Sequence, residues 1–267
     1  MKNDNRPIGV FDSGLGGLTV LKALKDLFPN ESFIYFGDTA HLPYGTKSKK
    51  TIIEYSNEIC DFLNKKNVKL IVIACNTASA LAFDFLEKKM IVPIVNVIDP
   101  CVEYATTKTK KKFIGVLGTK ATIGSKSYEN KLLKINSNLK ISSHACPLFV
   151  PLIEEGLISH KITKNICDLY LDKDIFKLID VLILGCTHYP LLIDKIEKYF
   201  SKHTIILDSA KIVALHIKKI FKKNILLKAK KNKKHDQYYL TDKSIQFNKL
   251  AAIFLKENSI KIKYIKL

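Results

Sequence analysis

The sequence predicts an α/β protein of two similar domains with mainly parallel sheets, and a functional site in the cleft between them. Short apolar runs alternate with segments whose apolar residues recur at helical spacing, a pattern typical of parallel sheets joined by helices. The segments IGVFDSG (8–14) and IGVLGTK (114–120) open two halves of similar plan. In each half, a later apolar run ends in a cysteine and two polar residues, as in LIVIACNT (70–77) and VLILGCTH (181–188).

The first half is expected to alternate strand and helix. Its strands are short apolar runs that read as buried, and its helices have an apolar face. In chain order we expect a strand over 6–13, a helix over 18–28, a strand over 32–38, a helix over 51–66, a strand over 68–75, a helix over 77–89 and a strand over 93–99. The polar run TKTKKK (107–112) then interrupts the pattern.

The second half repeats this alternation. We expect strands over 112–119, 139–147, 180–186 and 204–209, helices over 125–135 and 190–200, and further helical stretches before residue 180. The tail adds a helix, a strand over 236–242, another helix and the segment 260–267. This order suggests one domain of residues 1–98 plus 208–267 and a second of residues 99–207, with crossings near Asp99 and Asp208.

Length and composition limit the class of protein. With 267 residues, 47% of them hydrophobic, the chain can bury a sizeable core. No apolar run approaches the ~18 residues that a membrane span needs, so we expect no membrane partner. The start MKNDNRPIGVFDS has no apolar signal region, and six cysteines without a CxxC pair suit a reducing compartment. We therefore expect a cytoplasmic protein.

The formal charge of +19 raises the question of a polyanionic partner. Among the 44 basic residues only Arg6 is arginine, whereas recognition of bases and phosphates tends to use arginine. The lysines are scattered, with a denser run only at 218–235. These features favour a solvated lysine surface and no specific nucleic-acid partner.

Polar residues at the predicted strand ends mark the candidate site, because ligands of open parallel sheets bind outside the carboxyl ends of the strands. These residues are Asp12, Ser13, Asp38, Cys75, Asn76, Thr77, Thr119, Cys186, Thr187 and His188. Each cysteine of this set precedes a predicted helix, whose start should lower the thiol pKa and offer N–H groups to an anion. Two such loops face to face would place thiols on opposite sides of a small carboxylate. That geometry suits removal of a proton from one face of a carbon and its return to the other.

Other interpretations stay open at this point. Cysteine is often simply buried, and we expect only a core role for Cys60, Cys101, Cys146 and Cys167. Cys75, Cys186 and His188 also have the composition of a zinc site, although their spacing matches no recognised zinc pattern. The segment DSGLGG (12–17) lacks the third glycine of a dinucleotide loop. Its glycines more plausibly allow a tight turn that exposes Asp12 and Ser13.

Six motifs resemble the glutamate racemase family, a group of cofactor-independent enzymes that make D-glutamate for peptidoglycan. They are GVFDSGLGGLTV, GDTAHLPYGTKS, IVIACNTASA, GVLGTKATI, VPLIEEG and LILGCTHYPLL. The resemblance runs from residue 7 to residue 210, and more loosely to the end. It implies two-base racemisation of glutamate in a cleft between the domains, no metal or other cofactor, a role in cell-wall synthesis and cell shape, and a homodimer.

The resemblance also implies roles for individual residues. Cys75 and Cys186 match the catalytic cysteines, and Asp12 and His188 match the polar groups that assist them. The substrate-binding pairs correspond to Asp12 with Ser13, Tyr44 with Gly45, Asn76 with Thr77, and Thr187 with His188. Asp38 and Glu154 match further acidic residues near the site, and Thr119 is a strand-end candidate. His41 stands where many members have arginine. A racemase of aspartate or another small acid would keep both thiols and change the pocket for the side chain.

Overall fold

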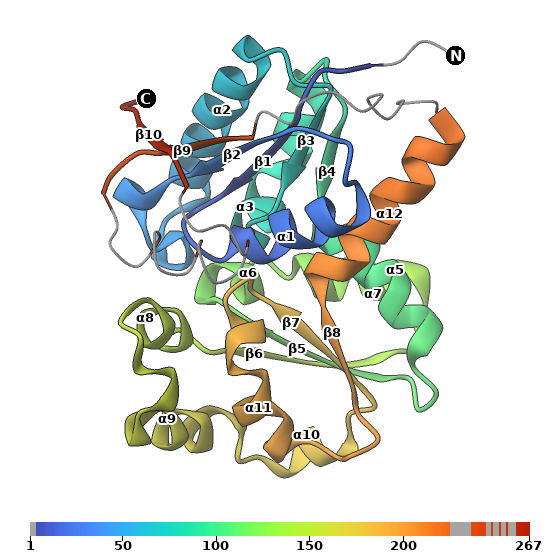
Figure 1. Cartoon of the computed structure of the whole chain (residues 1–267). Helices are drawn as coiled ribbons and strands as arrows, with labels where there is room; N and C mark the ends of the chain where they lie inside the picture. Colours follow the sequence, from blue (N-terminus) through green and yellow to red (C-terminus); the bar gives the residue numbers. More distant parts are fainter. Residues whose placement is uncertain (1–3, 225–235, 244–246, 248–250, 252–254, 256–259) are drawn as a thin grey trace.

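Two sheets organise the computed structural model, which describes residues 4–224, 236–243, 247, 251, 255 and 260–267 (Figure 1). The first sheet has the order β10 (Ile262–Tyr264), β9 (Gln237–Leu240), β2 (Phe33–Gly37), β1 (Ile8–Asp12), β3 (Leu70–Ile73) and β4 (Ile94–Asn96). The second has the order β6 (Lys140–Ala145), β5 (Phe113–Gly118), β7 (Val181–Gly185) and β8 (Ile205–Asp208). Every pair of neighbouring strands is parallel, and the predicted fold class is confirmed.

The two sheets share one plan. The order β2-β1-β3-β4 in the first corresponds strand for strand to β6-β5-β7-β8 in the second. The similar opening segments therefore form the equivalent strands β1 and β5, and the two cysteine runs form the equivalent strands β3 and β7. The strands within residues 8–96 and 237–264 form one sheet, and the strands within residues 113–208 form the other. The exact domain boundaries remain a prediction.

Helices connect the strands and cover the sheets (Figure 1). They are α1 (Gly17–Leu27), α2 (Lys49–Lys65), α3 (Asn76–Leu81), α4 (Phe83–Lys89), α5 (Ile98–Lys108), α6 (Lys120–Gly124), α7 (Ser127–Ile135), α8 (Phe149–Glu154), α9 (Lys161–Leu171), α10 (Asp174–Leu178), α11 (Ile193–Ile196) and α12 (Ser209–Asn224). The chain also forms short 3-10 turns, which are labelled η. They are η1 (Thr39–His41), η2 (Tyr44–Thr46), η3 (Leu157–Ser159), η4 (Tyr189–Leu192) and η5 (Glu197–Tyr199).

The central strands of each sheet are buried on both faces, which explains why they read as continuous apolar runs. In the first sheet, Val10 and Val72 pack with α1 and α12, while Phe11 and Ile73 pack with α2 and α4. In the second sheet, one face packs against α8, α9 and α11, and the other against α5 and α7.

The four cysteines outside the strand-end loops belong to these cores. Cys60 lies in the cluster under α2, Cys101 in the cluster under α5, and Cys146 and Cys167 in the cluster around α8 and α9. All four side chains are completely buried. The predicted core role is confirmed.

The structure differs from the predicted elements at several places. The predicted helix 190–200 is a short α-helix, α11, between the 3-10 turns η4 and η5. Helix α5 starts at Ile98, where a strand to residue 99 was predicted, because the Asn96 side chain accepts the N–H groups of Ile98 and Asp99 at 2.8 and 2.9 Å. The predicted helix 77–89 is divided at Ala82 into α3 and α4. Helix α6 precedes the predicted helix 125–135, and Lys126, at φ 55°, separates α6 from α7.

Two expectations lie outside the described residues: most of the lysine run 218–235, and nearly all of the tail helix expected between residues 242 and 260. Within the described part of the chain, no helix combines the length and apolar character that crossing a bilayer requires.

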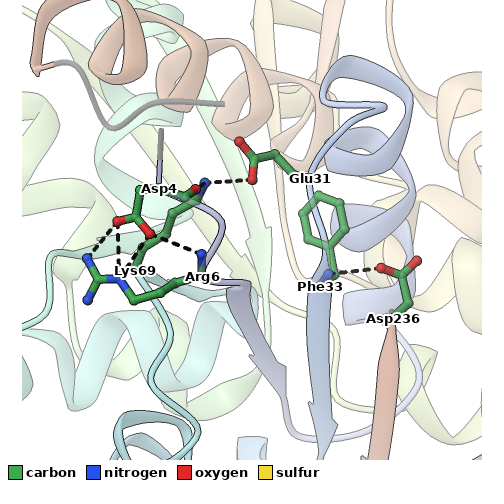
Figure 2. A network of polar contacts seen from close by, with 6 residues as sticks. All are labelled: Asp4, Arg6, Glu31, Phe33, Lys69 and Asp236. Atoms are coloured by element: carbon green, nitrogen blue, oxygen red, sulfur yellow. Dashed lines mark hydrogen bonds and ion pairs between the residues drawn. The ribbon is translucent and has the colours of Figure 1, made fainter. Parts of the chain in front are cut away.

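A polar network lies at the amino-terminal ends of the strands of the first sheet (Figure 2). Lys69, just before β3, contacts the Glu31 carboxylate at 2.6 Å and donates to the Asp4 carbonyl at 2.8 Å. The Lys69 and Glu31 side chains are 0% and 1% exposed. At the same end of the sheet, the Asp236 carboxylate accepts the N–H of Phe33 at 2.9 Å. This hydrogen bond connects the residue before β9 to β2.

Candidate active site

The carboxyl ends of the strands converge on one cavity. Asp12 ends β1 and Cys75 follows β3, while Thr119 follows β5 and Cys186 follows β7. The space between these strand ends, including the open solvent at its mouth, is about 510 Å³. Its lining comes from both sheets: Ser13, Leu42, Pro43, Tyr44, Gly45, Thr46, Cys75, Asn76, Thr77, Thr119, Lys120, Pro147, Val150, Cys186, Thr187 and His188.

Cys75 is the N-cap of α3. Its sulfur accepts the N–H of Ala78 at 3.5 Å and lies 3.7 Å from the Ser13 hydroxyl oxygen. Burial, reinforced by the nearby Asp12 carboxylate, raises the pKa of the Cys75 thiol to about 12. The expectation that the helix start lowers this pKa is wrong in its net direction. The Ala78 N–H does favour the thiolate, but burial of a side chain only 5% exposed outweighs it.

Cys186 has a different neighbour. Its sulfur lies 3.9 Å from Nδ1 of His188, whose Nε2 lies 2.6 Å from the Glu154 carboxylate. Burial lowers the pKa of His188, but the contacts with Cys186 and Glu154 together raise it well above its ordinary value. These two contacts therefore favour the protonated form of His188. An anionic sulfur at Cys186 would have a cation beside it, whereas one at Cys75 would have the Asp12 carboxylate.

We expect Glu154→Gln to lower the pKa of His188, because the substitution removes one of the two contacts that raise it. The imidazolium would then lose its proton at a lower pH than in the parent protein. An NMR titration of the His188 ring measures this midpoint. Glu155→Gln, at the exposed neighbouring position, is the matched control and should leave the midpoint unchanged. An equal midpoint in the Glu154→Gln protein would contradict the assignment of Glu154 as the partner of His188.

Asp12 joins the loop after β1 to the loop after β7. Its carboxylate accepts the N–H of Gly14 at 2.9 Å and the Thr187 hydroxyl at 3.4 Å. Burial raises the pKa of Asp12, while the neighbouring His188 opposes this shift. The predicted exposure of Asp12 and Ser13 is wrong, since they are only 0% and 6% exposed.

Gly16 allows these two loops to approach one another. A Cβ atom there would lie 2.2 Å from the Thr187 hydroxyl oxygen and 2.6 Å from Nδ1 of His188. A side chain at this position would displace Thr187 and His188. Glycine is therefore needed for the close approach of the two loops.

Asp38 organises the loop that carries Tyr44 and Gly45. Its carboxylate lies 2.5 Å from the Tyr44 hydroxyl and 2.8 Å from Nδ1 of His41, and it accepts the Thr241 hydroxyl at 2.8 Å. Thr241, directly after strand β9, thus supports the cavity wall from the carboxyl-terminal part of the chain. Gly45 lies so close to Thr119 that a Cβ there would be 2.6 Å from the threonine Cβ.

Three threonine hydroxyls link the two halves across the cavity wall. Thr77 lies 3.0 Å from Thr119 and 3.2 Å from Thr122, and the latter two are 2.9 Å apart. Thr119 is also the N-cap of α6, accepting the N–H of Thr122. Thr122, missed from the sequence, lies three residues after this cap, the spacing at which a capped N–H is expected.

The structure brings most predicted site residues to the cavity surface and leaves three behind it. Asp12, Asp38 and Glu154 do not line the cavity, but each contacts a residue that does: Thr187, Tyr44 and His188 respectively. Sequence reasoning missed Leu42, Pro43, Thr46, Lys120, Pro147 and Val150 in the lining. Most of these adjoin predicted residues; Pro147 lies two residues before α8, and Val150, within α8, is the first residue of the motif VPLIEEG.

No group of three or more histidine, cysteine or acidic side chains within the described part of the chain has an arrangement that could hold a metal ion. The geometry therefore lends no support to the zinc alternative for Cys75, Cys186 and His188.

Comparison with known proteins relates this arrangement to one family. The sequence model of the Asp/Glu/Hydantoin racemase family matches residues 9–217. A glutamate racemase from Persephonella marina is 47% identical over 246 residues, which is 92% of each chain.

Solved structures agree with this relationship. A glutamate racemase from Francisella tularensis, crystallised with D-glutamate, has 37% identity and a TM-score of 0.89 over 98% of both chains. A glutamate racemase isoform from Bacillus anthracis has 34% identity and a TM-score of 0.91, again over 98% of both chains.

Proposed function

The chain belongs to the Asp/Glu/Hydantoin racemase family, and on this premise we propose that it interconverts L- and D-glutamate with two cysteines as acid and base. The predicted family and the predicted class of enzyme, an amino-acid racemase, are confirmed. The observation that carries the proposal is the placement of Cys75 and Cys186 after equivalent strands of the two sheets, in the lining of one cavity.

The proposed reaction inverts one carbon by moving two protons. A thiolate on one side takes the α-hydrogen as a proton, and the pair of electrons from the broken C–H bond stays on the carbon. The thiol on the opposite side gives its proton to the other face, forming the new C–H bond and leaving a thiolate. Holding both sulfurs at the substrate supplies proximity and general acid–base catalysis, the latter worth roughly 10²–10⁴-fold.

The groups next to the two sulfurs fit these roles of base and acid. Cys75 is a thiol at neutral pH, because burial and Asp12 raise its pKa to about 12. Cys186 lies 3.9 Å from Nδ1 of His188, and a protonated ring there would stabilise an anionic sulfur. We propose that these neighbours make Cys186 the base and Cys75 the acid for one enantiomer, and that the roles reverse for the other.

The remaining polar lining suits an amino acid with two carboxylates. The lining carries the hydroxyl groups of Ser13, Thr77 and Thr187 and the side-chain amide of Asn76. We propose that the pairs Asp12–Ser13, Tyr44–Gly45, Asn76–Thr77 and Thr187–His188 bind the substrate. Asp38, Thr119 and Glu154 are proposed to position them.

Several finer statements belong to the same proposal. We propose that the D-glutamate serves peptidoglycan synthesis and cell shape, that the enzyme works in the cytoplasm as a homodimer, and that it requires no cofactor. The lysine-rich surface is proposed to be a solvated face without a specific nucleic-acid partner. Residues 1–98 plus 208–267 and residues 99–207 are proposed to form two domains with the substrate in the cleft between them.

The direct test is circular dichroism of L- and D-glutamate incubated with purified protein freed of metal and pyridoxal phosphate. The proposal predicts that either enantiomer converges on the racemic mixture, and that aspartate under the same conditions racemises far more slowly. Faster racemisation of aspartate than of glutamate would show that aspartate is the preferred substrate. No change with any small acidic amino acid, or change only after pyridoxal phosphate is added, would refute the proposal.

A further inference from the structure

Tyr128 connects the two halves of the molecule at the cavity wall. It lies on α7, beside the second sheet, and its side chain is 2% exposed. Its hydroxyl donates to the side-chain oxygen of Asn76 at 2.6 Å. Asn76 follows Cys75 directly, is the first residue of α3, and lines the cavity. A helix of one half thus holds a side chain of the thiol loop of the other.

The ring of Tyr128 also lies against the second thiol loop. A Cβ atom added at Gly185 would be 3.1 Å from Cε2 of Tyr128, so the ring occupies the space that this glycine leaves. Gly185 ends β7 and directly precedes Cys186. One buried side chain therefore contacts the residue after one cysteine and the residue before the other.

The Asn76 amide is satisfied on one side only. Its oxygen accepts the Tyr128 hydroxyl, while its nitrogen is buried and has no hydrogen-bond partner among the residues that the structure describes. Buried polar groups in proteins are nearly always paired, so an orphaned donor in a cavity lining points to a ligand. Burial raises the pKa of Tyr128 well above its ordinary value, so the hydroxyl keeps the proton that it donates.

The orientation of this amide decides whether Asn76 attracts or repels a carboxylate. An amide has a donor nitrogen and an acceptor oxygen, and only the nitrogen can bond a carboxylate oxygen. We propose that Tyr128 is a positioning residue for substrate binding: its hydroxyl holds the Asn76 oxygen, so that the Asn76 nitrogen donates to a carboxylate of the amino acid. This inference rests on the proposed function and adds a residue that none of the predicted binding pairs contains.

Tyr128→Phe removes the hydroxyl and keeps the ring against Gly185. The Asn76 amide then loses its fixed orientation, and we expect KM to rise about tenfold for both L- and D-glutamate, with kcat changed by less than about twofold. Because the enantiomers have equal free energy, kcat/KM must fall by the same factor in both directions. KM does not depend on the concentration of folded enzyme, so the readout remains valid if the variant folds in lower yield.

A double-mutant cycle separates positioning from a general structural role. In an Asn76→Ala background, which lacks the amide, Tyr128→Phe should leave KM unchanged within about twofold. Tyr199→Phe is the matched control: it removes a tyrosine hydroxyl that donates to Asp168, away from the cavity, and should leave KM at the parent value.

An unchanged KM in Tyr128→Phe, or an equal rise in KM with and without the Asn76 amide, would overturn the inference. Absence of glutamate racemisation in the parent protein would instead refute the proposed function, so the two failures are distinguishable.

Discussion

Alanine at either Cys75 or Cys186 is expected to abolish racemisation in both directions, lowering kcat by about 10³-fold or more. Each direction needs one sulfur as base and the other as acid, so neither cysteine is dispensable for either enantiomer. Both sulfurs lie in the lining of the same cavity, at equivalent strand ends. The measurement is circular dichroism of each enantiomer over time, with each variant at high enzyme concentration.

Cys60→Ala is the matched control for these variants. Cys60 is completely buried in the core under α2 and is absent from the cavity lining. Its replacement should cost roughly 1 kcal/mol of stability and leave kcat close to the parent value. Near-normal racemisation by Cys75→Ala or Cys186→Ala would mean that the thiols are core residues and that the two-thiol mechanism is wrong.

Lys69→Met is expected to lower the free energy of unfolding by about 3–5 kcal/mol. The substitution keeps an apolar side chain of similar length but removes the cation that lies 2.6 Å from Glu31 (Figure 2). Glu31 is 1% exposed, so its carboxylate cannot be rehydrated without disturbing the fold. Urea unfolding, followed by far-ultraviolet circular dichroism, measures the difference from the parent protein.

An exposed ion pair provides the comparison. Lys89 contacts Asp61 at 2.9 Å, but both side chains are 41% exposed, and Lys89→Met should cost no more than about 1 kcal/mol. The double variant Lys69→Met with Glu31→Leu removes both buried charges and should recover most of the stability lost by Lys69→Met alone. An equal decrease in the free energy of unfolding for Lys69→Met and Lys89→Met would show that the buried ion pair contributes no more to stability than the exposed one.

Much of the fold could be predicted from local pattern, because the central strands of both sheets are buried on both faces and stand out as apolar runs. Helix α5 could not, because its start depends on the Asn96 side chain accepting two backbone N–H groups, and its sequence also suits a strand end. The strand order was likewise beyond the sequence, since neither periodicity nor composition states which strands are neighbours. The similar openings of the two halves did indicate two halves of similar plan, and their sheets share one strand order.

The candidate site shows the same division. Residues at strand ends, such as Cys75 and Cys186, were predictable because the topology of a parallel sheet fixes where its strand ends lie. The direction of the pKa shift of Cys75 was not, because it depends on burial and on the distance of Asp12 across a loop. Tyr128 and Thr241 were also missed: each acts from a distant segment through one hydroxyl, and no motif marks it.

The measurement that tests the two-thiol account most directly is the isotope content of the first product formed in D₂O. L-glutamate is incubated with the enzyme, and the reaction is stopped while only a small fraction has converted. The account predicts D-glutamate with deuterium at the α-carbon, since the delivering thiol has exchanged with solvent, and remaining L-glutamate with its original hydrogen. D-glutamate that retains the original α-hydrogen would mean that a single base serves both faces, and would contradict the account.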